Sequence, residues 1–196
     1  MRTGRAPILL TAVTLASALT LTACTDGGGK TTGSAGGNYV IGPSGISTVA
    51  RGERVAAPKL DGETVEGGTL DTSTLKGKVV VLNVWGSWCG PCRTEAPYFK
   101  QVSEELAKDV AFVGINTRDN SKQSALNFEK DYGITYPSLF DPSGKLILRF
   151  PKGNLNPAAI PSTIVLDKEG KIAARALTAI DDKRLRKMID PLLAEK

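Results

Sequence analysis

The residues best suited to chemistry are two cysteines in the run Trp88-Cys89-Gly90-Pro91-Cys92. The 196-residue chain has one other cysteine, Cys24, and no histidine. Three cysteines are too few for a disulfide-stapled scaffold or a four-cysteine zinc site. The lack of histidine excludes a Ser-His-Asp triad, an HExxH zinc site and a histidine-ligated haem. Any chemistry must therefore use cysteine, carboxylate, lysine or tyrosine side chains.

The spacing of Cys89 and Cys92 suits thiol-disulfide exchange if a helix begins at Cys89. A thiolate is the attacking species, and the free N–H groups of a first helical turn should lower the pKa of the Cys89 thiol while leaving it exposed. Cys92 then lies one turn further on the same face, where it can resolve a mixed disulfide. Pro91 fits this turn, because its missing N–H costs nothing there.

A CxxC pair can also form half of a zinc site or attach haem, but this chain lacks the residues that either role needs. A zinc site lacks its other two ligands, and haem attachment needs a histidine where Arg93 stands. We therefore expect a redox pair that requires neither a metal nor an organic cofactor.

The flanking sequence predicts the elements that position this pair. Residues 78–85 form an apolar, β-branched run typical of a buried central strand, and apolar residues at 92, 96, 99, 102 and 106 then follow helical spacing. Further patterns predict strands over 110–116, 162–167 and 171–177, and helices over 121–132 and from Asp181 or Asp182 onward. The alternation predicts an α/β domain with a mixed central β-sheet flanked by helices.

The first 24 residues have the layout of an export signal. Arg2 and Arg5 precede 18 uncharged residues, Ala6–Ala23, and then Cys24. The small residue before a cysteine resembles the bacterial lipoprotein signal, in which that cysteine is acylated. An uncleaved membrane helix is the alternative, since 18 residues lie near the lower spanning limit.

These features predict three regions. Residues 1–23 are expected to be a lipoprotein signal peptide, and residues 24–50 a lipidated Cys24 followed by a flexible tether rich in Gly, Ser and Thr. Residues 51–196 are expected to form the folded domain. The net charge of +5 comes without a basic cluster interleaved with aromatic residues, so we expect no nucleic-acid partner.

The residues around the cysteine pair resemble the thioredoxin superfamily, and within it the extracytoplasmic, membrane-anchored branch that includes the TlpA and ResA types. The likeness covers residues 55–195, approximately, and rests on the runs Gly77–Trp85, Trp88–Arg93 with Glu95 and Pro97, and Ile160-Pro161-Ser162-Thr163. It implies a thioredoxin fold, with residues 120–137 as a helical central insertion, and thiol-disulfide oxidoreductase activity.

The resemblance also implies how a substrate is held. It places a cis peptide bond before Pro161, beside the cysteines, and leaves the Ile160 backbone free to pair with an extended substrate strand. Trp88, Gly90 and Pro91, next to Cys89 in the sequence, are expected to contact the same substrate.

One departure from the superfamily concerns the proton acceptor. Cytoplasmic thioredoxins carry a buried aspartate six residues before the first cysteine, whereas this chain has Asn83, which cannot act as a base. Glu95 matches a carboxylate that the membrane-anchored branch uses, so we nominate it as the proton acceptor for Cys92. The alternative is a surface glutamate that merely favours the first turn of a helix.

The resemblance implies an enzyme that reduces disulfides in exported proteins, with apocytochrome c a possible substrate. Gly90 and Pro91 between the cysteines resemble reducing members, whereas oxidising relatives hold a histidine there. Reduction outside the cell needs a transmembrane thiol electron donor. We thus expect a lipid-anchored protein on the extracytoplasmic side of the cell membrane, held by Cys24.

Two alternatives remain open. A peroxiredoxin-like thiol peroxidase would need Pro and Thr or Ser at seven and three residues before its reactive cysteine, but Leu82 and Gly86 precede Cys89 at those places. A non-catalytic lipoprotein could instead use the cysteines as a redox-sensing switch while it binds a partner. Only a measurement of catalytic turnover distinguishes this second alternative from an enzyme.

Overall fold

The computed structural model describes residues 1, 38–42 and 44–195. Within these ranges the chain forms a seven-stranded sheet of order β1-β2-β9-β8-β5-β6-β7 and a two-stranded sheet of β3 and β4. The strands are β1 (Tyr39–Ile41), β2 (Ile46–Val49), β3 (Asp61–Glu63), β4 (Thr69–Asp71), β5 (Val79–Trp85), β6 (Val110–Thr117), β7 (Ser138–Asp141), β8 (Ser162–Leu166) and β9 (Ile172–Ala176). The helices are α1 (Gly90–Glu105), α2 (Lys122–Tyr132) and α3 (Asp182–Ala194), with 3₁₀ turns at Arg51–Glu53, Thr72–Leu75 and Ile147–Arg149.

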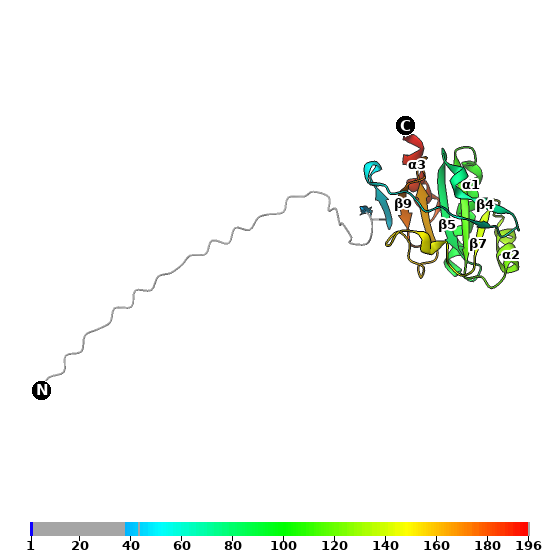
Figure 1. Ribbon diagram of the computed structural model, residues 1–196, viewed down its shortest axis with the longest axis horizontal. Coiled ribbons are helices and arrows are strands. Elements are labelled where there is room, and N and C mark those ends of the chain that lie inside the picture. The colour runs from blue at the N-terminus through cyan, green and yellow to red at the C-terminus, as the bar shows by residue number, and fades with distance from the viewer. Residues whose placement is uncertain (2–37, 43, 196) are drawn as a thin grey trace.

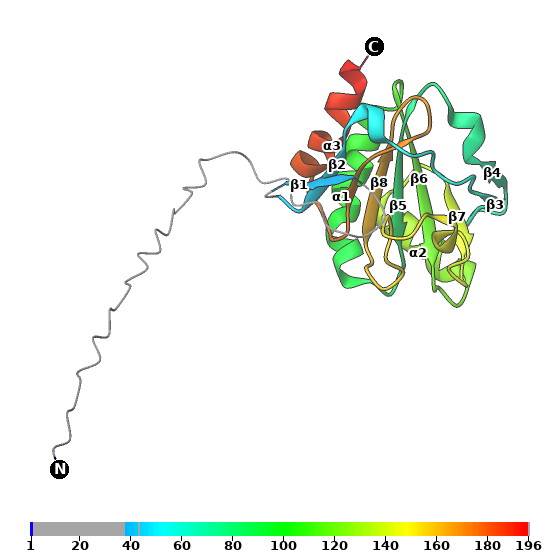
Figure 2. The same cartoon turned by 60° about the vertical axis from the view of Figure 1, so that its left-hand side comes forward.

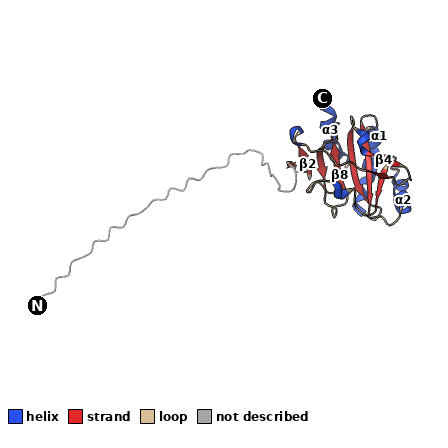
Figure 3. Cartoon of the chain, viewed as in Figure 1, coloured by secondary structure: helices blue, strands red, loops and turns tan. Residues whose placement is uncertain are grey.

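The large sheet is mixed. β5 pairs in parallel with β6 and β6 with β7, whereas the remaining neighbours run antiparallel. Every residue of β5 is buried, as expected of a central strand. The predicted α/β fold with a mixed central sheet flanked by helices is therefore confirmed (Figures 1 and 3).

Alternate side chains of β5 build the core on both faces of the sheet. Val79 belongs to a buried cluster with Phe99 of α1 and Leu185 of α3. Val80 belongs to a second cluster with Leu60 and Phe150, from the segments before β3 and before β8. Figure 2 shows α1 and α3 on one side of the sheet and the segment with β3 and β4 on the other.

The helices begin and end at residues suited to those places. The hydroxyl of Ser121 accepts a hydrogen bond from Ser124 N, and Gly133 ends α2 in the left-handed conformation, with φ 64°. The carboxylate of Asp181 accepts one from Arg184 N at 2.8 Å, which starts α3. The predicted helices and the strands that precede them are thus found within one or two residues of the expected positions.

The predicted boundary between tether and domain at residue 50 is wrong. β1 and β2 lie within the predicted tether, yet β2 pairs with β9 and β1 pairs with β2, so both extend the large sheet. Tyr39 and Val49 are buried in the second core cluster. Short strands in a Gly- and Ser-rich segment carry little signal of their own, because their stability comes from pairing with a strand distant in sequence.

The predicted signal peptide, apart from Met1, lies outside the described residues, as do Cys24 and residues 25–37. In the described ranges, no helix has both the length and the apolar character needed to cross a membrane.

Candidate active site

The cysteine pair lies where β5 gives way to α1. β5 ends at Trp85, a short turn follows, and Cys89 is the residue that caps the N-terminus of α1. Its sulfur accepts a hydrogen bond from Cys92 N at 3.2 Å. Gly86 allows the turn, since a Cβ there would lie 2.5 Å from Trp88 Nε1 and 3.0 Å from Thr117 O. Cys89 therefore stands at the N-terminus of the helix, as the motif predicts.

Cys89 and Cys92 are joined by a disulfide bond. The residues are only 3% and 1% exposed, respectively. The expectation that the helix start exposes Cys89 is thus wrong for the disulfide form, because Cys89 lies in an apolar cluster that includes Trp85 and Phe128. Exposed residues flank it instead, namely Trp88, Gly90 and Pro91.

Pro161 stands beside this pair. The Ile160–Pro161 peptide bond is cis, as the resemblance implies. β8 begins at the next residue and pairs with β5, with Ser162 opposite Val84, so Pro161 lies at the same end of the sheet as Cys89. Ile160 packs against the cluster that contains both cysteines. Within the described ranges its backbone N–H and C=O make no backbone hydrogen bond, which leaves both available to an added strand.

Glu95 is buried on the inner face of α1, with 2% of the residue exposed. Its Oε1 accepts a hydrogen bond from Asn83 Nδ2 at 2.8 Å, and its Oε2 accepts one from Ile180 N at 3.1 Å. Burial raises the pKa of Glu95 to about 8, although these two hydrogen bonds oppose the rise. The alternative of a surface glutamate is therefore wrong.

A small cavity connects Cys92 with the surroundings of Glu95. Its volume is about 10 Å³, roughly the space of one water molecule. The walls include Cys92, Asn83 and Tyr136. Asn83 also donates a hydrogen bond to Glu95, so one side chain both lines the cavity beside Cys92 and contacts the carboxyl group. Burial, together with the charges of Glu95 and Glu129, raises the pKa of Tyr136.

The turn after β6 supports the turn after β5, a feature that the sequence reasoning missed. Thr117 O accepts a hydrogen bond from Trp88 Nε1 at 3.2 Å. The Asp119 carboxylate accepts hydrogen bonds from Ser87 N at 2.9 Å, from the Ser87 hydroxyl and from Asn116 Nδ2 at 2.6 Å. Parallel strands end at one edge of a sheet, so the register of β5 and β6 brings these turns together. Asp119 stands two residues after β6, but its place in the sequence alone does not indicate this contact, because the contact depends on which strands are neighbours.

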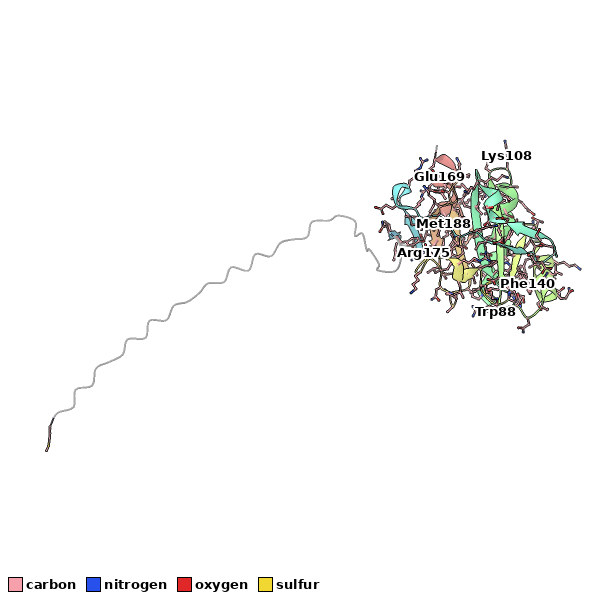
Figure 4. All side chains as sticks on the ribbon, in the orientation of Figure 1. Trp88, Lys108, Phe140, Glu169, Arg175 and Met188 are labelled. Atoms are coloured by element: carbon pink, nitrogen blue, oxygen red, sulfur yellow. A yellow bond between two sulfur atoms is a disulfide. The ribbon has the colours of Figure 1, made fainter. Side chains whose placement is uncertain are left out.

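The arrangement provides a dithiol/disulfide couple at a helix N-terminus, a buried carboxyl group three residues after its second cysteine, and free backbone groups at Ile160, which packs on the cluster that contains both cysteines. In the described residues, no group of three or more His, Cys, Asp and Glu side chains is placed to hold a metal ion. Figure 4 shows Trp88, which marks the site, at the lower end of the domain in that view.

Comparisons with known proteins agree with this geometry. The model of the Redoxin family matches residues 50–189. The thiol-disulfide oxidoreductase ResA of Bacillus cereus is 30% identical over 122 residues, which are 62% of this chain and 67% of that protein. A DsbF homologue from Corynebacterium diphtheriae superposes with a TM-score of 0.72 at 40% identity, covering 77% of this chain and 95% of that one. A secreted thiol-disulfide isomerase from Corynebacterium glutamicum gives a TM-score of 0.72 at 33% identity, covering 79% and 96%.

Proposed function

Because the chain belongs to the Redoxin family and is a protein thiol-disulfide oxidoreductase with a thioredoxin-like fold, we propose that it reduces disulfides in exported proteins through Cys89 and Cys92. The observation that carries this proposal is the disulfide between these two cysteines at the start of α1, beside the cis Ile160–Pro161 bond. The reducing direction is supported by Gly90 and Pro91 between the cysteines and by the lack of histidine in the chain.

The two cysteines have different roles in this reaction. In the reduced enzyme the Cys89 thiolate attacks a substrate disulfide, forms a mixed disulfide and releases one substrate thiolate. Cys92 then loses its proton and attacks the Cys89 sulfur, which forms the enzyme disulfide and releases the second thiolate. Two electrons pass to the substrate in total, which leaves as two thiolates, and the one proton released comes from Cys92. The hydrogen bond from Cys92 N to the Cys89 sulfur supports the assignment, because such a donor stabilises negative charge on that sulfur.

Glu95 is proposed to take the Cys92 proton. Cys92 and Glu95 are three residues apart on the buried face of α1, and the cavity beside Cys92 reaches the Asn83 side chain that holds Glu95. A general base functions best when its pKa lies near the working pH, and a value of about 8 meets that condition.

The substrate is proposed to bind as an added strand. The unpaired backbone groups of Ile160 would hydrogen-bond to it, next to Pro161, while the exposed surfaces of Trp88, Gly90 and Pro91 contact its side chains. Main-chain recognition tolerates many sequences, which suits an enzyme with several exported substrates. Apocytochrome c, implied by the family resemblance, is the first substrate to test.

The proposed location is the extracytoplasmic face of the cell membrane, with Cys24 as the lipid anchor. The signal-like sequence before Cys24 supports export, and the C. glutamicum relative is described as secreted. Each turnover leaves the enzyme as its disulfide, so a reductant must restore the dithiol. For an enzyme outside the cytoplasm, we propose a transmembrane thiol protein as that electron donor.

Trapping the mixed disulfide tests the proposal. A Cys92→Ser variant of the full chain is expressed in cells that export it to their membrane. It should accumulate covalent adducts of Cys89 with exported proteins, because the resolving thiol is absent. A Cys89→Ser variant provides the matched control and should form far fewer adducts. If no adduct forms and the wild-type chain reduces no disulfide, the enzymatic proposal fails and the redox-sensing alternative takes its place.

A further inference from the structure

Arg118 occupies an unusual position beside the cysteine pair. It follows β6 directly, and its φ of 57° makes it the one non-glycine residue with a left-handed backbone in the described ranges. This conformation costs about 1 kcal/mol for a residue with a Cβ, so neighbouring contacts must hold it. Those contacts are present, because Thr117 and Asp119 on either side are hydrogen-bonded to Trp88 and Ser87.

The side chain of Arg118 links two loops that border the site. Its guanidinium carbon lies 4.7 Å from the centroid of the Trp88 ring, and one terminal nitrogen donates a hydrogen bond to Pro157 O at 3.1 Å. Trp88 belongs to the turn before Cys89, and Pro157 lies three residues before Ile160. The guanidinium is thus held against the residue before the proposed nucleophile and against a residue three positions before the backbone proposed to receive the substrate strand.

Most of the hydrogen-bonding capacity of this guanidinium is unused. Arg118 is exposed, and it forms no ion pair within 4.0 Å in the part of the chain that the structure describes. One of its five N–H groups is engaged, by Pro157 O, and stacking on Trp88 fixes its plane. A preorganised guanidinium with free donors is suited to a carboxylate, which it can bind through two hydrogen bonds.

The loops around the site strengthen this preference. Residues 86–94, 117–122 and 150–161 contain four basic residues, Arg93, Arg118, Lys122 and Lys152, but only one acidic residue, Asp119. Asp119 is 4% exposed, and both of its oxygens already accept hydrogen bonds. On the α2 side the groove beside Arg93 also contains Asp131, so the charge there is mixed. Lys122 is already paired with the exposed Glu63, whereas Arg118 forms no ion pair within the described residues.

We propose that Arg118 is a specificity-determining residue that binds an acidic side chain next to the reactive cysteine of the substrate. The inference rests on the proposed function and narrows its substrate class to disulfides flanked by Asp or Glu. A substrate strand paired with the Ile160 backbone would pass Pro157, where Arg118 is held. The carboxylate then replaces water on the free donors of a side chain that is already ordered, so little entropy is lost on binding.

Paired peptides test this specificity. Two peptides with one internal disulfide, identical except for Glu or Gln beside each cysteine, are given to the reduced full chain in detergent, and disulfide loss is followed in a single turnover. The wild type should reduce the Glu peptide about two- to fivefold faster, the range of an exposed ion pair. This preference should shrink with added salt. An Arg118→Gln variant should lose the preference.

Charge reversal separates recognition from a structural role. An Arg118→Glu variant should reduce a Lys-flanked peptide faster than the Gln peptide, an outcome that simple loosening of the loop cannot produce. A Lys108→Gln variant is the matched control, because Lys108 is exposed and lies at the end of the domain opposite Trp88 (Figure 4). It loses the same charge and should keep the wild-type preference.

The results distinguish the two levels of the proposal. Equal rates for the Glu and Gln peptides with the wild type, or an unchanged preference in Arg118→Gln, would overturn the role of Arg118 and leave the reductase function intact. Equal slowing of every peptide by both Arg118 variants, without reversal, would also overturn it. Failure of the wild type to reduce any peptide would overturn the proposed function itself.

Discussion

Asn83 donates a hydrogen bond from its side-chain amide to the buried carboxyl group of Glu95, with Nδ2 and Oε1 2.8 Å apart. Asn83 occupies the place where cytoplasmic thioredoxins have an acidic residue, and the carboxyl group that it holds comes from α1. A buried carboxyl group is therefore still present close to the second cysteine in the chain, but it comes from α1 and not from β5.

Glu95 should make the free energy of unfolding of the disulfide form decrease as pH rises. Its pKa is about 8 in the folded protein against 4.5 in the unfolded chain, so folding takes up a proton between these values and the free energy of unfolding falls as pH rises from about 4.5 to about 8. The full loss has an upper bound of about 5 kcal/mol. Urea unfolding at several pH values should show a shallower decline for Glu95→Gln than for the wild type.

The same titrations need two comparisons. Burial also raises the pKa of Glu129, to about 7, so part of the decline should remain in the variant. A Glu104→Gln variant changes an exposed glutamate on the same helix and should follow the wild-type curve. Parallel curves for Glu95→Gln and the wild type would show that Glu95 is ionised in the folded protein.

Glu95 should also control how quickly Cys92 resolves the mixed disulfide. Without a proton acceptor, the buried Cys92 thiol loses its proton slowly, and general-base catalysis typically contributes about 100-fold or more. In Glu95→Gln the mixed disulfide with a model substrate should therefore persist about 100-fold longer, as measured by acid quenching and mass spectrometry. The wild-type rate of resolution should rise with pH up to about 8, and the variant should lack this inflection. Equal lifetimes in both proteins would remove Glu95 from the mechanism.

Gly114 of β6 should tolerate no side chain. A Cβ there would lie 2.0 Å from Ser138 Oγ and 2.7 Å from Trp85 Nε1, two atoms that hydrogen-bond to each other at 3.2 Å. Gly114→Ala should therefore destabilise the protein by about 1–3 kcal/mol, seen as a lower urea midpoint without a change in slope. Gly52→Ala is the control, since nothing lies within 4 Å of its Cβ. An equally small effect at both positions would contradict the packing around Trp85.

Tyr39 should contribute to the stability of the folded domain. Its hydroxyl donates a hydrogen bond to Asn154 Oδ1 at 2.5 Å, and the Arg175 guanidinium lies 3.8 Å from the ring centroid. Tyr39→Phe leaves the Asn154 oxygen buried without that donor, at a cost of about 1–2 kcal/mol in the free energy of unfolding. Tyr98→Phe, at a more exposed tyrosine, should cost much less. If the two variants are equally stable, the β1 segment does not pack on the sheet in solution.

The parts of the site that sequence could predict are those with strong local signals. The β-branched run of β5 and the helical spacing after Cys89 placed the cysteine pair, and the family resemblance placed the cis bond before Pro161. The burial of Glu95 could also be predicted from the sequence. It lies three residues after Cys92 and four before Phe99, both of which the helical spacing places on the inner face. Its charge is the reason that an exposed glutamate stood as the alternative to a proton acceptor.

The parts that sequence could not predict depend on contacts between distant segments. β2 is ordered by its pairing with β9, about 130 residues further along the chain, and β1 by its pairing with β2. Asp119 supports the turn at Ser87 only because β5 and β6 are parallel neighbours, which requires the strand order. Arg118 is placed by the same register, and no motif marks it.

The position of β1 also limits where the enzyme can operate. β1 begins at Tyr39, 15 residues after Cys24. A polypeptide spans at most about 3.5 Å per residue, so with Cys24 anchored in the bilayer as proposed, the edge of the sheet can stand no more than about 50 Å from the lipid surface. Substrates are then sorted by their distance from the bilayer as well as by their chemistry. Proteins that have just emerged from an export channel are within reach, and those that have diffused away are not.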